Sequence, residues 1–288
     1  MDTGDRAYLS ILGWPSGFDE NRRVESLVVC AGVAPFVAGQ MARRETPAIV
    51  HMFDNVLRDE VLGALHADGV LALAPTRGEV KGYPEPIEPR EVERFPDLPG
   101  AFAVHTRDGG MWSFTTGDVR LVVAGTVRHT GKVRRHEDGG ARYAGWHSFY
   151  GLHHYPGAAA QEALRHAEGS GWGAGSSKNT RALVMIDIHT VVDGEHRLLR
   201  LSGATTRIGV VGQERSRPSL LDQHKPIDEI QQLLAGAPVE LGFDAFNTPS
   251  DVEGMADAAG QGGNRLNPVA FHFFSVWSAL IDRRLHGW

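Results

Sequence analysis

The sequence has a single cysteine, no excess of basic residues and no long apolar run, and each of these absences excludes a class of protein. Cys30 cannot form an internal disulfide or a cysteine-based zinc cluster, so any bound metal would be held by histidine and carboxylate side chains. The formal net charge of -6 argues against a general nucleic-acid or membrane-surface binder. The longest apolar run, residues 26–39, contains Gly32 and Pro35 and is too short to span a bilayer.

The composition is otherwise that of an ordinary globular protein, with 42% hydrophobic and 22% charged residues. The first residues show no basic stretch followed by an apolar one, so we expect no signal peptide. Together with the single cysteine, this predicts a cytoplasmic protein. We expect one domain over residues 1–288, with a mainly helical part (1–100), a β core (101–212) and a C-terminal helical part with one strand (213–288).

The N-terminal part shows apolar residues at three- and four-residue spacing, which is typical of amphipathic helices. This spacing predicts helices over residues 21–31 and 35–44, and one long helix whose apolar stripe runs from Ile49 to Leu65. The sequence VLALAP at residues 70–75 then predicts a short buried strand. Residues 76–100 contain five prolines and are expected to form a loop around a short helix.

From residue 101 the apolar period changes to two, which indicates β-strands separated by short turns. Further strands are expected over 181–192, 196–203 and 205–212, and the first two are joined by a tight hairpin at Asp193-Gly194. A helix (157–168) and a Gly/Ser loop (169–180) interrupt the strands. Beyond Pro218 we expect a helix, one strand (238–246) and a final apolar helix over 268–285. This order predicts an α+β fold.

One motif in the β core suggests metal chemistry. His136 and Asp138 are two residues apart near the end of an expected strand, so both would point to one side. An imidazole and a carboxylate side by side, joined by one further histidine, form the facial triad of non-haem iron enzymes. His189, at the end of an apolar strand, is the candidate third ligand. Arg200 returns alongside it and could hold a carboxylate bidentately.

This order of residues resembles the iron(II)/2-oxoglutarate-dependent oxygenases over about residues 50–210. The resemblance implies an antiparallel double-stranded β-helix (jelly-roll-like) core, with Fe(II) bound by His136, Asp138 and His189. It also implies that Arg200 holds 2-oxoglutarate with help from Ser202. A small or mid-sized organic substrate would then be oxidised by hydrogen abstraction. In the co-substrate role, Arg207 is an alternative to Arg200.

Two other functions stay open on the sequence. The C-terminal third follows the element order of an RNase H-like nuclease, in which Asp187, Glu229 and Asp244 would bind two magnesium ions. The chain could instead be a non-enzymatic binding or assembly protein on an α+β scaffold. Its final apolar helix suits either the core or the interface of a homodimer. The first hypothesis expects a small-molecule substrate, and none of the three involves a membrane.

Overall fold

The computed structural model describes residues 5–131, 179–202, 206–210, 234, 236–246, 249 and 268–288. The chain divides into two compact units, one formed by residues 1–127 and 183–288 and the other by residues 128–182. Of the second unit, only the ends of two strands are described. The helix expected over residues 157–168 and the helix expected after Pro218 lie outside the described residues.

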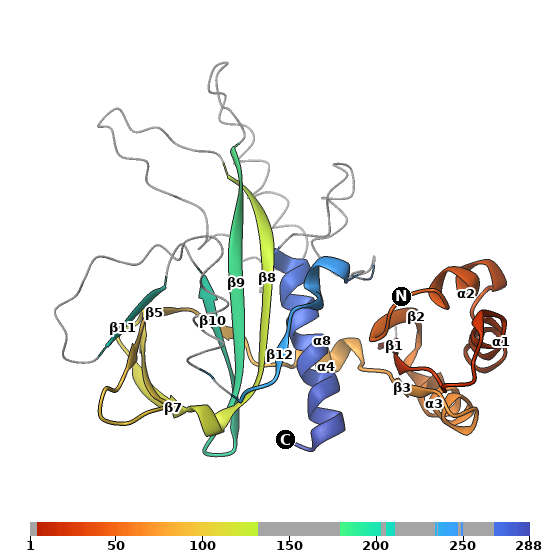
Figure 1. The fold of residues 1–288 in the computed structure, drawn as a ribbon, viewed down its shortest axis with the longest axis horizontal. Coiled ribbons are helices and arrows are strands. Elements are labelled where there is room, and N and C mark those ends of the chain that lie inside the picture. Colours follow the sequence, from red (N-terminus) through yellow and green to blue (C-terminus); the bar gives the residue numbers. More distant parts are fainter. Residues whose placement is uncertain are drawn as a thin grey trace. The chain divides into compact units, whose positions relative to one another are not determined.

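The N-terminal part of the first unit is a three-stranded antiparallel sheet with helices, in the strand order β2-β1-β3 (Figure 1). Successive side chains of its central strand point to opposite faces of the sheet, and both faces are buried. Leu9 and Ile11 pack against the helices, while Tyr8 lies edge-on to Phe273 of the last helix. The elements are β1 (Arg6–Gly13), α1 (Glu20–Ala31), α2 (Pro35–Met41), β2 (Ala48–Asp54), η1 (Asn55–Leu57), α3 (Arg58–Ala67) and β3 (Leu71–Leu73).

Local capping defines where these helices begin and end. The Asp19 side chain accepts a hydrogen bond from the Arg22 amide at 2.8 Å and starts α1, and Gly32 ends it in the left-handed conformation with φ 65°. The Asp54 carboxylate accepts from the Val56 amide at 3.1 Å, which caps a 3-10 turn between β2 and α3.

The helices expected from residues 21 and 35 are confirmed, and so is the strand at 70–75. The single helix expected from Ile49 to Leu65 is wrong, because its first part is the strand β2 and the helix α3 begins at Arg58. The strand β1 was not expected at all. Its two buried faces remove the apolar–polar alternation by which a strand is recognised in a sequence.

The rest of the first unit contains two sheets. Sheet B has the strand order β12-β8-β9-β10-β4 and sheet C the order β11-β5-β6-β7. The expected loop over 76–100 contains the helix α4, as predicted, and also the strands β4 and β5, which were missed. The elements are α4 (Arg77–Lys81), β4 (Pro86–Ile87), β5 (Pro89–Arg94), β6 (Ala101–Thr106), β7 (Met111–Thr115), η2 (Thr116–Asp118), β8 (Val119–Gly131), β9 (Asn179–Val192), β10 (Glu195–Ser202), β11 (Arg207–Val210), β12 (Val239–Glu240), η4 (Gly242–Ala245) and α8 (Pro268–His286).

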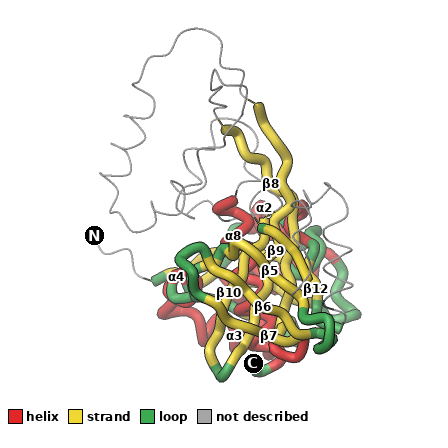
Figure 2. The backbone as a smooth tube through the Cα atoms, turned by 90° about the vertical axis from the view of Figure 1, so that its left-hand side faces the viewer, coloured by secondary structure: helices red, strands yellow, loops and turns green. Residues whose placement is uncertain are grey.

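Sheets B and C pack face to face around one hydrophobic cluster. Phe102, Val104 and Phe114 of sheet C meet Ile188 and Leu199 of sheet B. The strands β5, β6 and β7 accordingly overlie β9 and β10 in Figure 2. Burying a side chain of this size stabilises a fold by about 1.5–3 kcal/mol, so this cluster is a main source of stability.

The last helix, α8, covers the other face of sheet B (Figure 1). Leu198 of β10 packs there against Val276 and Leu280. The pleat of β9 and β10 therefore sends alternate residues to the sheet C side and to the α8 side. The two strands are joined at Asp193 (φ 54°) and Gly194 (φ 80°), which confirms the predicted tight hairpin. The α+β class is also confirmed.

Candidate functional site

The α8 side of β9 and β10 holds a cluster of polar side chains where an apolar layer would be expected. Asp187 and His189 come from β9 and Arg200 from β10, and all three are 0% exposed. In the register of the two strands Arg200 lies opposite Asp187, and Leu198 lies opposite His189. The sequence thus correctly placed His189 and Arg200 on neighbouring strands. We call these three residues with Tyr83, His272 and Ser275 the buried polar cluster.

Arg200 and Asp187 form a bidentate ion pair at the centre of the buried polar cluster. The Arg200 Nε donates to Asp187 Oδ1 at 2.7 Å and Nη2 donates to Oδ2 at 2.6 Å. Nη2 also donates to His272 Nδ1 at 3.1 Å, and the guanidinium lies 5.6 Å from the centre of the Phe271 ring. Burial opposes ionisation of Asp187, but the Arg200 guanidinium outweighs it and keeps the pKa of that carboxyl below its usual value.

Both ring nitrogens of His189 are occupied by hydroxyl groups. Nδ1 lies 2.9 Å from Tyr83 Oη, and Nε2 lies 2.9 Å from Ser275 Oγ. Burial lowers the pKa of His189 to about 4 and raises the pKa of Tyr83, so both side chains are neutral. Ser275 also bonds to the Asp187 carboxylate, which can only accept. The consistent arrangement has Tyr83 donating to Nδ1, Nε2 donating to Ser275, and Ser275 donating to Asp187.

The residues expected to bind iron and 2-oxoglutarate are only partly described. His136 and Asp138 lie outside the described residues. His189 and Arg200 are fully engaged with protein groups, so as they stand they do not fit a metal ligand and a carboxylate anchor. Ser202 is 3% exposed, and its amide donates to Thr206 Oγ1 at 3.3 Å. Within the described ranges, no three His, Cys, Asp or Glu side chains are grouped as a metal site would require.

The alternative co-substrate anchor and the carboxylates expected in a nuclease are also only partly described. Arg207 begins β11, but the structure describes only its backbone. Of the three carboxylates expected in a nuclease, Asp187 is paired with Arg200, Glu229 lies outside the described residues, and Asp244 is placed in η4 by its backbone alone. The described residues therefore do not bring these three carboxylates together.

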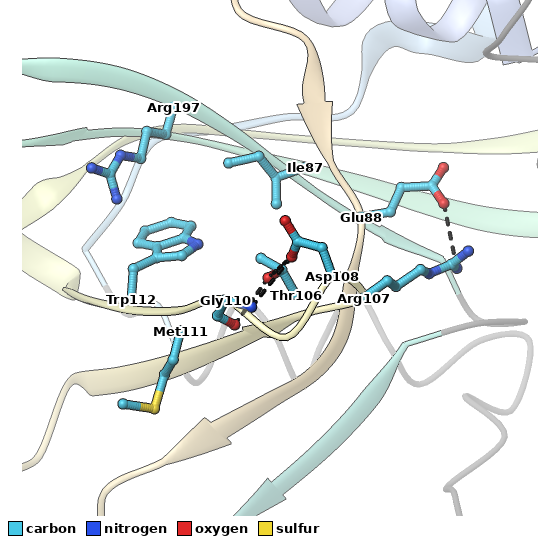
Figure 3. A pocket seen from close by; sticks show the side chains of 9 residues that line it. All are labelled: Ile87, Glu88, Thr106, Arg107, Asp108, Gly110, Met111, Trp112 and Arg197. Atoms are coloured by element: carbon cyan, nitrogen blue, oxygen red, sulfur yellow. Dashed lines mark hydrogen bonds and ion pairs between the residues drawn. The ribbon is translucent and has the colours of Figure 1, made fainter.

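A second region is open to solvent. A depression of about 560 Å³ lies between the β6–β7 hairpin on one side and β4 with Arg197 of β10 on the other. Figure 3 shows the Trp112 ring beneath Arg197, and the Asp108 carboxylate facing Ile87 across the opening. The Arg197 guanidinium lies 5.0 Å from the centre of the Trp112 ring. The lining residues are Ile87, Glu88, Thr106, Arg107, Asp108, Gly110, Met111, Trp112 and Arg197.

The depression adjoins the strand β7, which lies at one end of sheet C. An outer strand presents unpaired backbone groups to any extended chain, and proteins usually protect it with charge, proline, a bulge or a short length. β7 reads Met-Trp-Ser-Phe-Thr and has neither charge nor proline. It pairs with β6 without a register shift, and its residues Met111, Ser113 and Thr115 are exposed.

The other outer strands that the structure describes are better protected. β4 and β12 have two residues each and β3 has three. β2 carries a register shift against β1 and ends in Asp54, while β11 is four residues long and begins with Arg207. β7 is therefore the least protected of the described sheet edges. The sequence contained the signal, an uncharged five-residue strand, but not the strand order that makes it an edge.

No family model matches this chain, and no curated protein or solved structure matches it either. Of the helices within the described ranges, none has the length and apolar character needed to cross a membrane.

Proposed function

We propose that this protein is a binding module that takes up an extended segment of a partner protein along β7. The observation that carries this proposal is the unprotected edge of β7 beside an open depression. In strand addition the main-chain hydrogen bonds of the edge supply affinity, while a neighbouring pocket selects a side chain. Both components are present here, and they are adjacent.

The size of the edge predicts a weak and reversible complex. A five-residue strand buries much less than the roughly 1,200 Å² that stable protein–protein interfaces bury. This favours a short peptide segment over a second folded copy of this chain, since a dimer held by so small an area would not persist.

The edge can be tested with a labelled nonapeptide of Thr, Val and Ser, which favours the extended conformation. We expect saturable binding by fluorescence anisotropy, and slower hydrogen exchange at the backbone amides of residues 111–115 in the complex. Ser113→Lys places a charge on the edge and should weaken binding by about tenfold or more. Ser16→Lys makes the same change in a remote exposed loop and should bind as the wild type does. Equal binding by the Ser113→Lys protein would refute the proposal.

The iron(II)/2-oxoglutarate oxygenase, with its double-stranded β-helix, is a second proposal. One observation favours it: His189 and Arg200 lie on one face of neighbouring strands, as the spacing predicted. Against it, both side chains have protein partners, and the described strands form open sheets. Titration of the purified protein with iron(II) under anaerobic conditions distinguishes the proposals. Stoichiometric binding that is lost in His136→Ala and Asp138→Ala would favour the oxygenase.

A further inference from the structure

The depression beside β7 has one charged group without a partner of opposite charge. The Arg107 guanidinium lies 3.4 Å from the Glu88 carboxylate, and that of Arg197 lies 3.3 Å from the Glu195 carboxylate. Asp108 forms no ion pair within the described part of the chain; its bonds are to neutral donors. One negative charge is therefore left over at the depression.

The Asp108 carboxylate is held in place by the turn that contains it. Its Oδ1 accepts hydrogen bonds from Thr106 Oγ1 and, at 3.3 Å, from the Gly110 amide. The turn is closed by the Thr106 amide, which donates to the Gly110 carbonyl at 2.9 Å, and Gly109 adopts φ 91°. These donors, the Thr106 hydroxyl above all, lower the pKa of Asp108, so the group is ionised at neutral pH. Its other oxygen is directed toward Ile87 in Figure 3.

Two apolar groups line the depression beside this carboxylate. Ile87 lies across from it and the Trp112 ring lies to one side, whereas the Met111 side chain points away from both (Figure 3). Such walls suit a long aliphatic stem that ends in a charge, as in lysine and arginine. The Asp108 carboxylate would repel an acidic side chain of the partner, and a neutral side chain would leave the charge of Asp108 unpaired.

Two features favour lysine over arginine. A guanidinium binds a carboxylate best through both oxygens, but Oδ1 of Asp108 already accepts two hydrogen bonds from its own turn. A guanidinium also binds well by stacking on an aromatic ring, but the Arg197 guanidinium already lies over the Trp112 ring. An ammonium needs only one oxygen and no ring face.

We infer that the partner segment carries a lysine whose ammonium binds Asp108 while its stem lies between Ile87 and Trp112. This inference rests on the proposed function, because the segment along β7 brings the lysine to the depression. The interaction supplies selectivity rather than the main part of the affinity, since an exposed ion pair contributes little.

The test uses the nonapeptide of Thr, Val and Ser with one varied central residue: Lys, Arg, norleucine or Glu. Dissociation constants are measured by anisotropy at low salt. We expect the lysine peptide to bind the wild-type protein about fivefold more tightly than the norleucine peptide. Arginine should fall between them, and glutamate should be the weakest. In Asp108→Asn, which keeps an oxygen for the turn, the ratio of lysine to norleucine affinity should fall to about one. The matched variant Asp97→Asn should retain the wild-type ratio.

The outcomes separate the two proposals. If the wild type binds all four peptides with equal affinity, or if Asp108→Asn keeps the lysine preference, the lysine inference fails while strand addition stands. If no peptide binds, or if Ser113→Lys binds every peptide as the wild type does, strand addition fails and the lysine inference fails with it. Circular dichroism of each variant confirms that the fold is retained.

Discussion

The strand β10 carries two arginines three residues apart, and its pleat sends them to opposite faces of sheet B. Arg200 points to α8, where its side chain is 0% exposed and paired bidentately with an equally buried Asp187. Arg197 points to the open depression, where its side chain is 28% exposed and its partner Glu195 is 73% exposed. The same residue type on the same strand thus lies in two very different environments.

The difference shows how to separate structural from functional polar groups in this protein. Within the described residues, no member of the buried polar cluster has a buried side-chain nitrogen or oxygen without a hydrogen-bond partner, so the cluster needs no ligand to be satisfied. Around Arg197, two polar groups each lack one kind of partner among the described residues. Asp108 has no cation beside it there, and the buried Trp112 Nε1 has no hydrogen-bond acceptor. Incomplete groups at an open surface are where a partner can add interactions.

Removing Arg200 should give the largest effect on stability. Arg200→Ala leaves the Asp187 carboxylate buried without a counter-charge, so we expect the free energy of unfolding to fall by about 3–5 kcal/mol. Urea denaturation at pH 7 measures this loss. The double variant Asp187→Leu/Arg200→Met removes both charges and should recover most of the stability. A loss under about 1 kcal/mol for Arg200→Ala would mean that water reaches the cluster.

The buried neutral His189 predicts a loss of stability in acid. Its pKa is about 4 in the folded protein against about 6.5 in the unfolded chain. The unfolded state therefore binds the proton first, and stability falls as the pH drops from about 6.5 to 4. The total contribution is about 3 kcal/mol. Urea denaturation at pH 7, 5 and 4 should show this loss in the wild type relative to His189→Gln; parallel curves for the two proteins would contradict it.

Two serines on α8 test, with a smaller expected effect, how much the hydrogen bonds of the buried polar cluster contribute to stability. Ser275 Oγ bonds to His189 Nε2, whereas the buried Ser278 Oγ has no partner in the described part of the chain. Ser275→Ala leaves buried groups unsatisfied and should cost about 1–3 kcal/mol in the free energy of unfolding. Ser278→Ala removes a hydroxyl that has no partner among the described residues and should be neutral or slightly stabilising. Thermal denaturation of the pair measures the contrast, and equal losses would mean that the hydrogen bond to His189 adds nothing.

Much of the fold could be predicted from local patterns. The hairpin at Asp193-Gly194 followed from turn chemistry, and β9 followed from the apolar run that ends at His189. Period-two alternation gave no signal for β1, whose two faces are both buried. β1 packs on helices with Leu9 and on α8 with Tyr8, so its sequence does not alternate. In β2, Ile49 and Phe53 fit a helical stripe equally well, and only pairing with β1 decides the outcome.

The candidate site was harder to predict, because its character depends on burial and strand order. The sequence brought His189 and Arg200 together correctly but could not show that Tyr83, 106 positions from His189 in the chain, occupies one nitrogen of that ring. Asp108 lies in the turn between β6 and β7. Its lack of a cation depends on which strands flank the turn in space.

The smallest effect is expected for Arg197→Ala. The variant removes an ion pair to the exposed Glu195, worth between zero and about 1 kcal/mol. It also removes the contact with the Trp112 ring, worth about 0.5–1 kcal/mol at a surface. The ion-pair partner Glu195 is exposed, so no buried charge is left without a counter-charge. We therefore expect the free energy of unfolding to fall by about 1 kcal/mol, a small part of the loss for Arg200→Ala.

Salt separates the two arginines further. Screening acts on exposed charges and much less on buried ones. Raising the salt concentration should therefore shrink the effect of Arg197→Ala and leave that of Arg200→Ala almost unchanged. Urea denaturation of both variants at low and high sodium chloride measures this. If Arg197→Ala costs as much as Arg200→Ala at both concentrations, the depression is part of the structural core, and a partner would not be able to add to it.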